Sequence, residues 1–422
     1  MSLCCTIMPM RFACQLFLIF ALFLSGCNTV ANDVSAEGIP SPTPFQPQEA
    51  GASDPIFSAP APTPLDLPTT TSVPTEIAAP PQEADTASPA APGELDPLTG
   101  LPPADPSLLN RRPIAIKVAN YPRYMRPQSG LTLADQVFEY FIEKELTRFI
   151  AVFYGNDSEW VGPVRSGRYF DEHILRMYQS YLVFKFADPR ELEYFRASDF
   201  SQFLVTPTNS AVCPPFHFLP ERMNTVEEYN NSYFDTTRWK DCVSASGGDN
   251  LRPSIRSGYF SDVAPAGDLP ATKINTYYSV DSYNYWEYNP NDRLYYRFQE
   301  INDMRDGVEE FAPLVDRVTG LQVHASNVIV LFVNHSFANN YDSEDEVFQI
   351  DLTGTGEAYV FRDGVGILAK WYRTDINQPL LLTSLSGSPI LMRPGITFYE
   401  VIGLRSYVDQ GDGEWTFRHD WP

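Results

Sequence analysis

Apolar runs of strand length alternate with helical periodicity in the first half of the folded region, which is typical of an α/β pattern. The runs are rich in aromatic and β-branched side chains, as expected of buried strands. Apolar positions recur at helical spacing over residues 168–180, which predicts an amphipathic helix, and a shorter helix is expected over residues 189–195. The predicted strands of this half are residues 114–118, 137–142, 148–154 and 181–186.

The pattern changes beyond residue 272 to short segments separated by turn signals such as the Arg-Asp-Gly at residues 362–364. Residues 200–270 show no clear period, and we expect long loops with short elements there. We therefore predict an α+β fold, with an N-terminal α/β subdomain over residues 96–270 packed against a mainly antiparallel β subdomain over residues 271–422. The strands predicted for the second half are residues 274–280, 285–288, 294–298, 327–333, 346–352, 357–362, 366–372, 380–383 and 397–402.

The N-terminus carries one apolar run, over residues 12–23 after Arg11, which is shorter than the roughly 20 residues that a permanent membrane helix needs. Its length and flanks fit a secretory signal. Leu24-Ser25-Gly26-Cys27 follows at once and resembles the bacterial lipobox, which implies cleavage before Cys27 and lipidation of that cysteine. We expect residues 1–27 to be a lipoprotein signal peptide. The alternative is an ordinary signal peptide with a chance cysteine.

Residues 28–95 differ from the rest in composition. They contain fourteen prolines among Ala, Thr, Ser and acidic residues, with no Lys or Arg and few large apolar side chains. Such a segment cannot bury enough apolar surface to fold, so we expect a disordered tether. Its reach would be about 45 Å as a flexible coil and roughly 200 Å as extended polyproline II.

The charge balance limits the partners. The whole chain has a formal charge of −23, and residues 111–422 hold 42 acids against 29 bases. A surface of that sign has no general attraction for nucleic acid or anionic lipid, so we expect no nucleic-acid partner. Any anionic ligand would need a local basic pocket.

Cysteine and histidine positions give little support for a cofactor. Cys4, Cys5 and Cys14 leave with the signal, so only Cys213 and Cys242 remain besides the lipidated Cys27. These two either form a disulfide, contributing roughly 3–4 kcal/mol in the chain-entropy model, or remain as buried thiols. The histidines lack the spacing of a metal site, and we predict no metal and no cofactor.

The residues that could carry chemistry gather in the first half. Arg165 and Arg168 lie beside glycines just ahead of the predicted helix, and arginine binds carboxylate or phosphate bidentately. One hypothesis is an anion-recognition pocket built from these two arginines and Arg126, with Asp135 or Glu139 as a possible base. The alternative is an internal salt-bridge network that fixes two loops. Arg148, which opens the third strand, could pair with Glu143 or Glu145 across the hairpin.

Several strings resemble the YerB-like lipoproteins, among them the Arg-Pro-Gln-Ser-Gly at residues 126–130, the Gly-Pro-Val-Arg-Ser at 162–166 and the Pro-Gly-Ile-Thr at 394–397. The matches extend over about residues 96–403. The resemblance implies a two-part extracytoplasmic domain of unknown function behind a lipoprotein signal. Residues 186–189 and 213–218 depart from the family pattern, which puts any shared ligand specificity in doubt.

Two functional classes follow. The first is a binding or scaffolding lipoprotein of the bacterial cell envelope, held to the membrane by the lipid on Cys27 and acting on a cell-wall polymer or an envelope protein. The second is an envelope enzyme, a hydrolase or transferase on an anionic glycan that uses Glu139 with Arg165 and Arg168. Convergence of these side chains in an open cleft would favour the enzyme, and burial as ion pairs would favour the binding protein.

Overall fold

The computed structural model describes residues 90–91, 93–207, 216–219, 230–256, 258–267, 269–338 and 346–420. The predicted signal peptide, nearly all of the predicted tether, Cys27 and Cys213 lie outside these ranges. Among the described residues, no helix is both long and apolar enough to cross a membrane.

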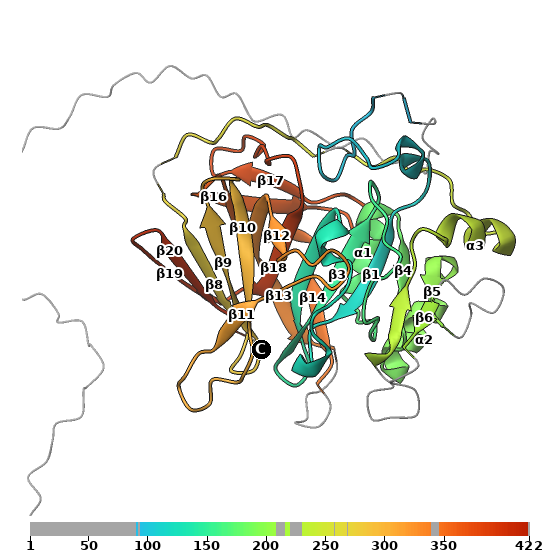
Figure 1. Cartoon of the computed structure of the whole chain (residues 1–422), viewed down its shortest axis with the longest axis horizontal. Helices are drawn as coiled ribbons and strands as arrows, with labels where there is room; N and C mark the ends of the chain where they lie inside the picture. Colours follow the sequence, from blue (N-terminus) through green and yellow to red (C-terminus); the bar gives the residue numbers. More distant parts are fainter. Residues whose placement is uncertain are drawn as a thin grey trace, which may run out of the picture. The chain divides into compact units, whose positions relative to one another are not determined.

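A long mixed sheet runs through both halves of the sequence (Figure 1). Its strand order is β17-β16-β15-β13-β18-β2-β3-β1-β4-β5, and β14 pairs with β13. The strands are β1 (Ile114–Ala119), β2 (Gln136–Ile142), β3 (Leu146–Phe153), β4 (Tyr181–Val183), β5 (Leu204–Val205), β13 (Asn327–Phe337), β14 (Phe348–Asp351), β15 (Gly354–Arg362), β16 (Val365–Arg373), β17 (Leu381–Ser384) and β18 (Thr397–Gly403).

A second sheet has the order β11-β10-β9-β8-β20-β19, with β12 paired to β10, and β6 and β7 form a separate hairpin. Except for β8 and β20, which are parallel, the neighbouring strands of the second sheet are antiparallel. The strands are β6 (Phe216–Phe218), β7 (Ser232–Phe234), β8 (Lys273–Tyr277), β9 (Tyr283–Asn289), β10 (Leu294–Glu300), β11 (Phe311–Pro313), β12 (His324–Ala325), β19 (Tyr407–Gly411) and β20 (Glu414–Arg418).

The α-helices of the described residues are short: α1 (Asp171–Tyr178), α2 (Pro189–Ala197) and α3 (Trp239–Ser246). A capping box starts α2, because Asp188 and Glu191 satisfy each other's backbone N–H groups and Pro189 occupies the first turn. Single 3-10 turns make up the rest: η1 (Pro106–Asn110), η2 (Arg123–Met125), η3 (Leu131–Leu133) and η4 (Ser201–Phe203).

The two faces of the long sheet bury different partners. Val137 and Phe141 of β2 pack in one apolar cluster with residues of the second sheet such as Trp286. Phe138 and Tyr140 alternate with them and pack in another cluster with helix α1. Figure 1 shows the second sheet on one side of the long sheet and the helices on the other. Consecutive residues of β2 therefore face different layers.

Most predicted strands form close to their predicted bounds, and the helix predicted over 168–180 forms as the shorter α1. The predicted division into two subdomains is not confirmed, because β18, from the end of the chain, lies between β13 and β2 in one sheet. The polar sequence around residues 409–414 gave no strand prediction, yet it forms the hairpin of β19 and β20. The protein is thus mostly β, with a few short helices.

Candidate functional site

Asp135, one possible base, is buried next to a second carboxyl group, that of Asp96. Its carboxyl accepts the backbone N–H groups of Tyr154 and Gly155, the latter at 2.9 Å. Burial and the neighbouring Asp96 raise the pKa of Asp135 well above its usual range, and burial raises the pKa of Asp96 to about 6. The two carboxyls share a hydrogen bond, so one holds a proton for the other. Asp135 therefore fixes the end of β3.

Glu139, the other possible base, belongs to a buried ion network between the two sheets. Arg297 of β10 donates to Glu139 at 2.5 Å and to Glu400 of β18 at 2.9 Å, and all three side chains are at most 1% exposed. Trp286 and Tyr278 donate to Glu400 at 2.8 and 3.0 Å. Burial raises the pKa of Glu139 to about 8, since the pull of Arg297 is partly offset by the charge of Glu400. The network holds the sheets together and presents no open carboxylate.

Arg126 lies on the same side of the long sheet as this network and does not join the other candidate arginines. Its guanidinium donates to the Glu300 carboxylate at 2.6 Å and to the backbone carbonyl of Asn120 at 3.1 Å. Glu300 is itself buried at the end of β10. Arg126 therefore matches the salt-bridge alternative, tying its loop to the second sheet.

Arg165 is held where the ends of β1 and β4 meet. Its backbone N–H donates to the carbonyl of Lys117 at 3.0 Å, and its carbonyl accepts the N–H of Lys185 at 3.1 Å. The Arg165 side chain is partly exposed, so this place is reached from the surface. Lys117 lies deeper, where its ammonium donates to the Asp171 carboxylate at 3.0 Å and both side chains are fully buried.

Arg168 is three residues further on and is paired with acids. Its Nε donates to Glu143 at 2.8 Å, a second guanidinium nitrogen contacts the same carboxylate, and Glu191 of α2 lies at 3.7 Å. Its backbone N–H donates to Asp171, which starts α1. Burial raises the pKa of Glu191 to about 7, so this acid is only partly charged at neutral pH.

Arg148 of β3 is the cation whose role the sequence did not reveal. The residue is only 4% exposed, and its Nη1 donates to the neighbouring carbonyl of Thr147 at 3.0 Å. No carboxylate among the described residues forms an ion pair with it, and its buried Nε finds no hydrogen-bond acceptor there. Burial and the nearby charges of Arg165 and Arg168 lower its pKa to about 9. The expected pair with Glu143 or Glu145 is wrong, since Glu143 binds Arg168 instead.

These side chains form one group, which we call the cationic cluster. Its cations are Lys117, Arg148, Arg165 and Arg168, and its acids are Glu143, Asp171 and Glu191. Within the described residues, Lys117 pairs with Asp171 and Arg168 pairs with Glu143, whereas Arg148 forms no ion pair with a carboxylate. A buried guanidinium that is close to other cations and has no acid beside it suits an anion as its partner.

The combination of Glu139 with Arg165 and Arg168 does not form. Arg148 pairs in register with Tyr140, so the cationic cluster lies on the α1 face of β2 and β3. Glu139 lies one position away and points to the opposite face, toward Arg297. The sheet therefore separates the predicted base from the predicted anion site.

The structure tests only part of the cysteine and metal predictions. Cys242 in α3 is buried and disulfide-bonded, but Cys213 lies outside the described residues, so their pairing stays a prediction. Lipidation of Cys27 stays one for the same reason. In the described part of the chain, no three His, Cys, Asp or Glu side chains are grouped to hold a metal ion.

Comparisons with known proteins agree with the resemblance found in the sequence. Residues 98–249 match the family described as protein of unknown function DUF3048, N-terminal domain, and residues 274–399 match its C-terminal domain. A Bacillus subtilis protein named "Putative lipoprotein YerB" is 28% identical over 285 residues, which are 65% of this chain and 77% of that protein.

The fold is also that of a solved relative. The match to the crystal structure of YerB from Bacillus subtilis covers 73% of this chain and 96% of the YerB chain, with a TM-score of 0.59 and 24% sequence identity. Along this chain the match to the N-terminal domain precedes the match to the C-terminal domain. The chain therefore belongs to the YerB-like family of DUF3048 proteins.

Proposed function

We propose that this protein is a lipid-anchored, extracytoplasmic binding protein of the bacterial cell envelope, and that its cationic cluster holds an anionic group of an envelope polymer. Phosphate and carboxylate share the chemistry that arginine recognises. The observation that carries the proposal is Arg148, a buried guanidinium near two other arginines that has no acid partner among the described residues. A cation in that setting costs stability unless a ligand compensates it.

Two further observations support binding in preference to catalysis. Glu139 and Asp135, the acids that an enzyme would use, are buried and hydrogen-bonded to Arg297 and to backbone N–H groups. Neither presents a carboxylate toward Arg165 from the same face of the sheet. An open cleft was expected of an enzyme and buried ion pairs were expected of a binding protein. The buried pairs seen here therefore favour the binding protein.

Substituting Arg148 by methionine should abolish anion binding and leave the protein as stable as the wild type, or more stable. The free energy of unfolding should rise by on the order of 2 kcal/mol, because the benefit of removing a buried charge without an acid partner exceeds the loss of its contacts with backbone dipoles. Methionine also keeps much of the apolar packing of the arginine side chain. Binding of a soluble polyglycerol phosphate and of a polyuronate can be measured by calorimetry, with neutral dextran as the control ligand.

The matched control is Lys117→Met, which removes a cation of the same cluster that does have an acid, Asp171. This variant should lose about 3–5 kcal/mol, since it leaves the buried Asp171 carboxylate without its cation. If Arg148→Met proves as destabilising as Lys117→Met, Arg148 is structural and the anion site is refuted. Unchanged affinity for both polymers in Arg148→Met would refute it as well.

The anchor has its own test. Cys27→Ala should move the protein from the membrane fraction to the soluble extracytoplasmic fraction, because the thioether lipid can no longer form. Fractionation and immunoblotting of cells that express each form measure this. Cys14→Ala, within the predicted signal, serves as the control and should leave the protein with the membrane. Full membrane retention of the Cys27→Ala form would contradict the lipoprotein assignment.

A further inference from the structure

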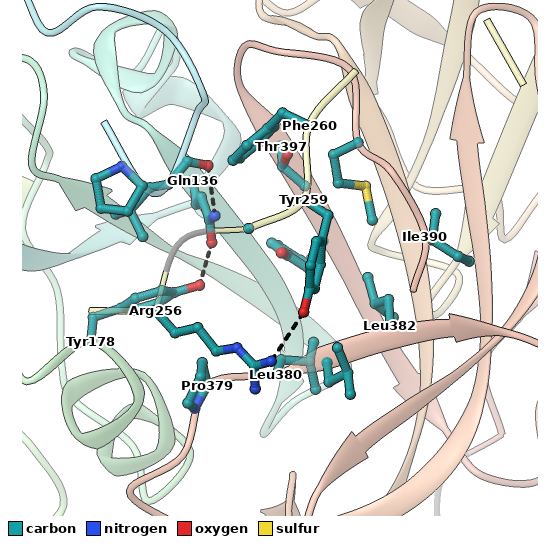
Figure 2. A pocket seen from close by; sticks show the side chains of 16 residues that line it. Gln136, Tyr178, Arg256, Tyr259, Phe260, Pro379, Leu380, Leu382, Ile390 and Thr397 are labelled. Atoms are coloured by element: carbon teal, nitrogen blue, oxygen red, sulfur yellow. Dashed lines mark hydrogen bonds between the residues drawn. The ribbon is translucent and has the colours of Figure 1, made fainter. Parts of the chain in front are cut away.

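A pocket separate from the cationic cluster opens at the other end of α1 (Figure 2). Strands β2 and β18 form its floor through Gln136, Thr397 and Tyr399, and Tyr178 closes the end of α1. Its cavity measures about 100 Å³, within about 750 Å³ of empty space counted out to the open mouth. Apolar side chains supply the remaining wall, among them Leu380, Leu382, Ile390 and Met392.

The roof of this pocket is fixed in place. Met392 donates its backbone N–H to the carbonyl of Tyr259 at 2.7 Å, and Ser261 donates to the carbonyl of Met392 at 2.9 Å. The ring of Phe260 packs on Gly100, where a Cβ atom would come within 2.5 Å of the ring. A pocket with such a roof is preformed, so a ligand would pay little ordering cost.

One polar group in the wall lacks a partner. Tyr399 is 7% exposed and its ring stacks on Phe138 with 4.2 Å between centroids, yet its hydroxyl makes no hydrogen bond to any described residue. The hydroxyl is not fully enclosed by protein atoms, so it is open to a ligand oxygen in the pocket. The other polar side chains at the floor are satisfied, since Tyr178 donates to Gln136, and Gln136 donates to the carbonyl of Leu98 at 3.0 Å.

A cation stands at the mouth. Arg256 is exposed, donates to the hydroxyl of Tyr259 at 3.0 Å and forms no ion pair with an acid in the described part of the chain (Figure 2). A pocket with apolar side chains along one wall, a tyrosine hydroxyl facing its space and an arginine at its rim is complementary to an amphiphilic anion.

We propose that this pocket binds a small apolar group that carries a carboxylate, with the apolar group inside, the carboxylate at Arg256 and a ligand oxygen at the Tyr399 hydroxyl. The cavity limits the apolar part to about the size of a leucine side chain or a small ring, since a cavity of roughly 150 Å³ accepts benzene. Two sources offer this chemistry: a free small acid and the C-terminal end of a peptide. The proposal is independent of the anion site at Arg148.

The test uses N-acetylleucine, its uncharged amide and a glycine-spaced tetrapeptide ending in leucine, each titrated into the purified full chain with calorimetry and ligand-observed NMR. We expect N-acetylleucine to bind at about millimolar affinity and at least about tenfold more tightly than the amide. Tighter binding of the tetrapeptide would identify a peptide end as the source, and equal or weaker binding would identify a free acid. Absence of binding by all three at about 10 mM would overturn the proposal.

Variants separate the parts of the pocket. Arg256→Gln should remove the preference for the acid over the amide, and Arg405→Gln, an exposed arginine elsewhere, should not. Tyr399→Phe should weaken binding about tenfold while the melting temperature stays unchanged, since the hydroxyl has no partner to lose. Tyr407→Phe, an exposed tyrosine, is its control. Unaltered binding in both Arg256→Gln and Tyr399→Phe would place the ligand elsewhere and refute the site.

Discussion

Substituting Arg297 by methionine should lower the free energy of unfolding by about 3–5 kcal/mol, because the change leaves Glu139 and Glu400 side by side in the core without their cation. Burial keeps both carboxylates away from water, and Glu400 pairs directly with Glu139 in the register of β18 and β2. Urea unfolding followed by tryptophan fluorescence measures the loss. The loss should be smaller at pH 5 than at pH 8, since protonated carboxyls need no cation.

Two further variants make this result interpretable. Arg305→Met removes an exposed arginine paired with Asp281 and should leave the free energy of unfolding nearly unchanged, because solvent screens the pair. Adding Glu139→Gln and Glu400→Gln to Arg297→Met removes the stranded charges and should recover part of the loss. If Arg297→Met costs no more than Arg305→Met, the network does not hold the two sheets together.

The Asp96–Asp135 pair should stabilise the protein more in acid than at neutral pH, and Asp96→Asn should remove that dependence. Burial raises the pKa of Asp96 to about 6 and that of Asp135 well above its usual range, so the folded state binds protons that the unfolded state releases near pH 4. The contribution of this pair to stability is then fully present below about pH 4 and is lost as the pH rises through about 6, the pKa of Asp96. The side-chain amide of asparagine can donate a hydrogen bond to Asp135 without needing a shared proton. The free energy of unfolding of this variant should therefore exceed that of the wild type by about 2 kcal/mol at pH 8.

Urea unfolding at pH 5 and pH 8 checks this expectation, with exposed Asp262→Asn as the control for the loss of one charge. The gain should be small at pH 5, because the wild-type pair already holds its proton there. A gain that is equal at both pH values, or equal to that of Asp262→Asn, would show that the two carboxyls do not share a proton.

The local pattern of apolar and charged residues was enough to predict most strands and some of the candidate site residues. The strand predicted over residues 137–142 forms as β2, with Glu139 toward Arg297 on one face and Tyr140 in the cluster with α1 on the other. Arg165 and Arg168 were found because they stand beside glycines ahead of a helix. Arg148, Arg297 and Glu400 carried a weaker signal, a charged residue within a strand of mostly apolar residues. That signal marks a buried charge but does not name its partner.

The sequence by itself determined the family, the expected lipid anchor at Cys27 and the positions of most strands, because these depend on short motifs and on periodicity along the chain. The tertiary structure alone decided which charges meet. Glu139 pairs with Arg297, 158 positions away, and β18 enters the sheet beside β2, so the partners are brought together by strand order and sheet packing. Ion pairing depends on distance in space, which periodicity does not encode. For the same reason Arg148 has no acid partner among the described residues, whereas Glu143, separated from the strand of Arg148 by two turn residues, binds Arg168.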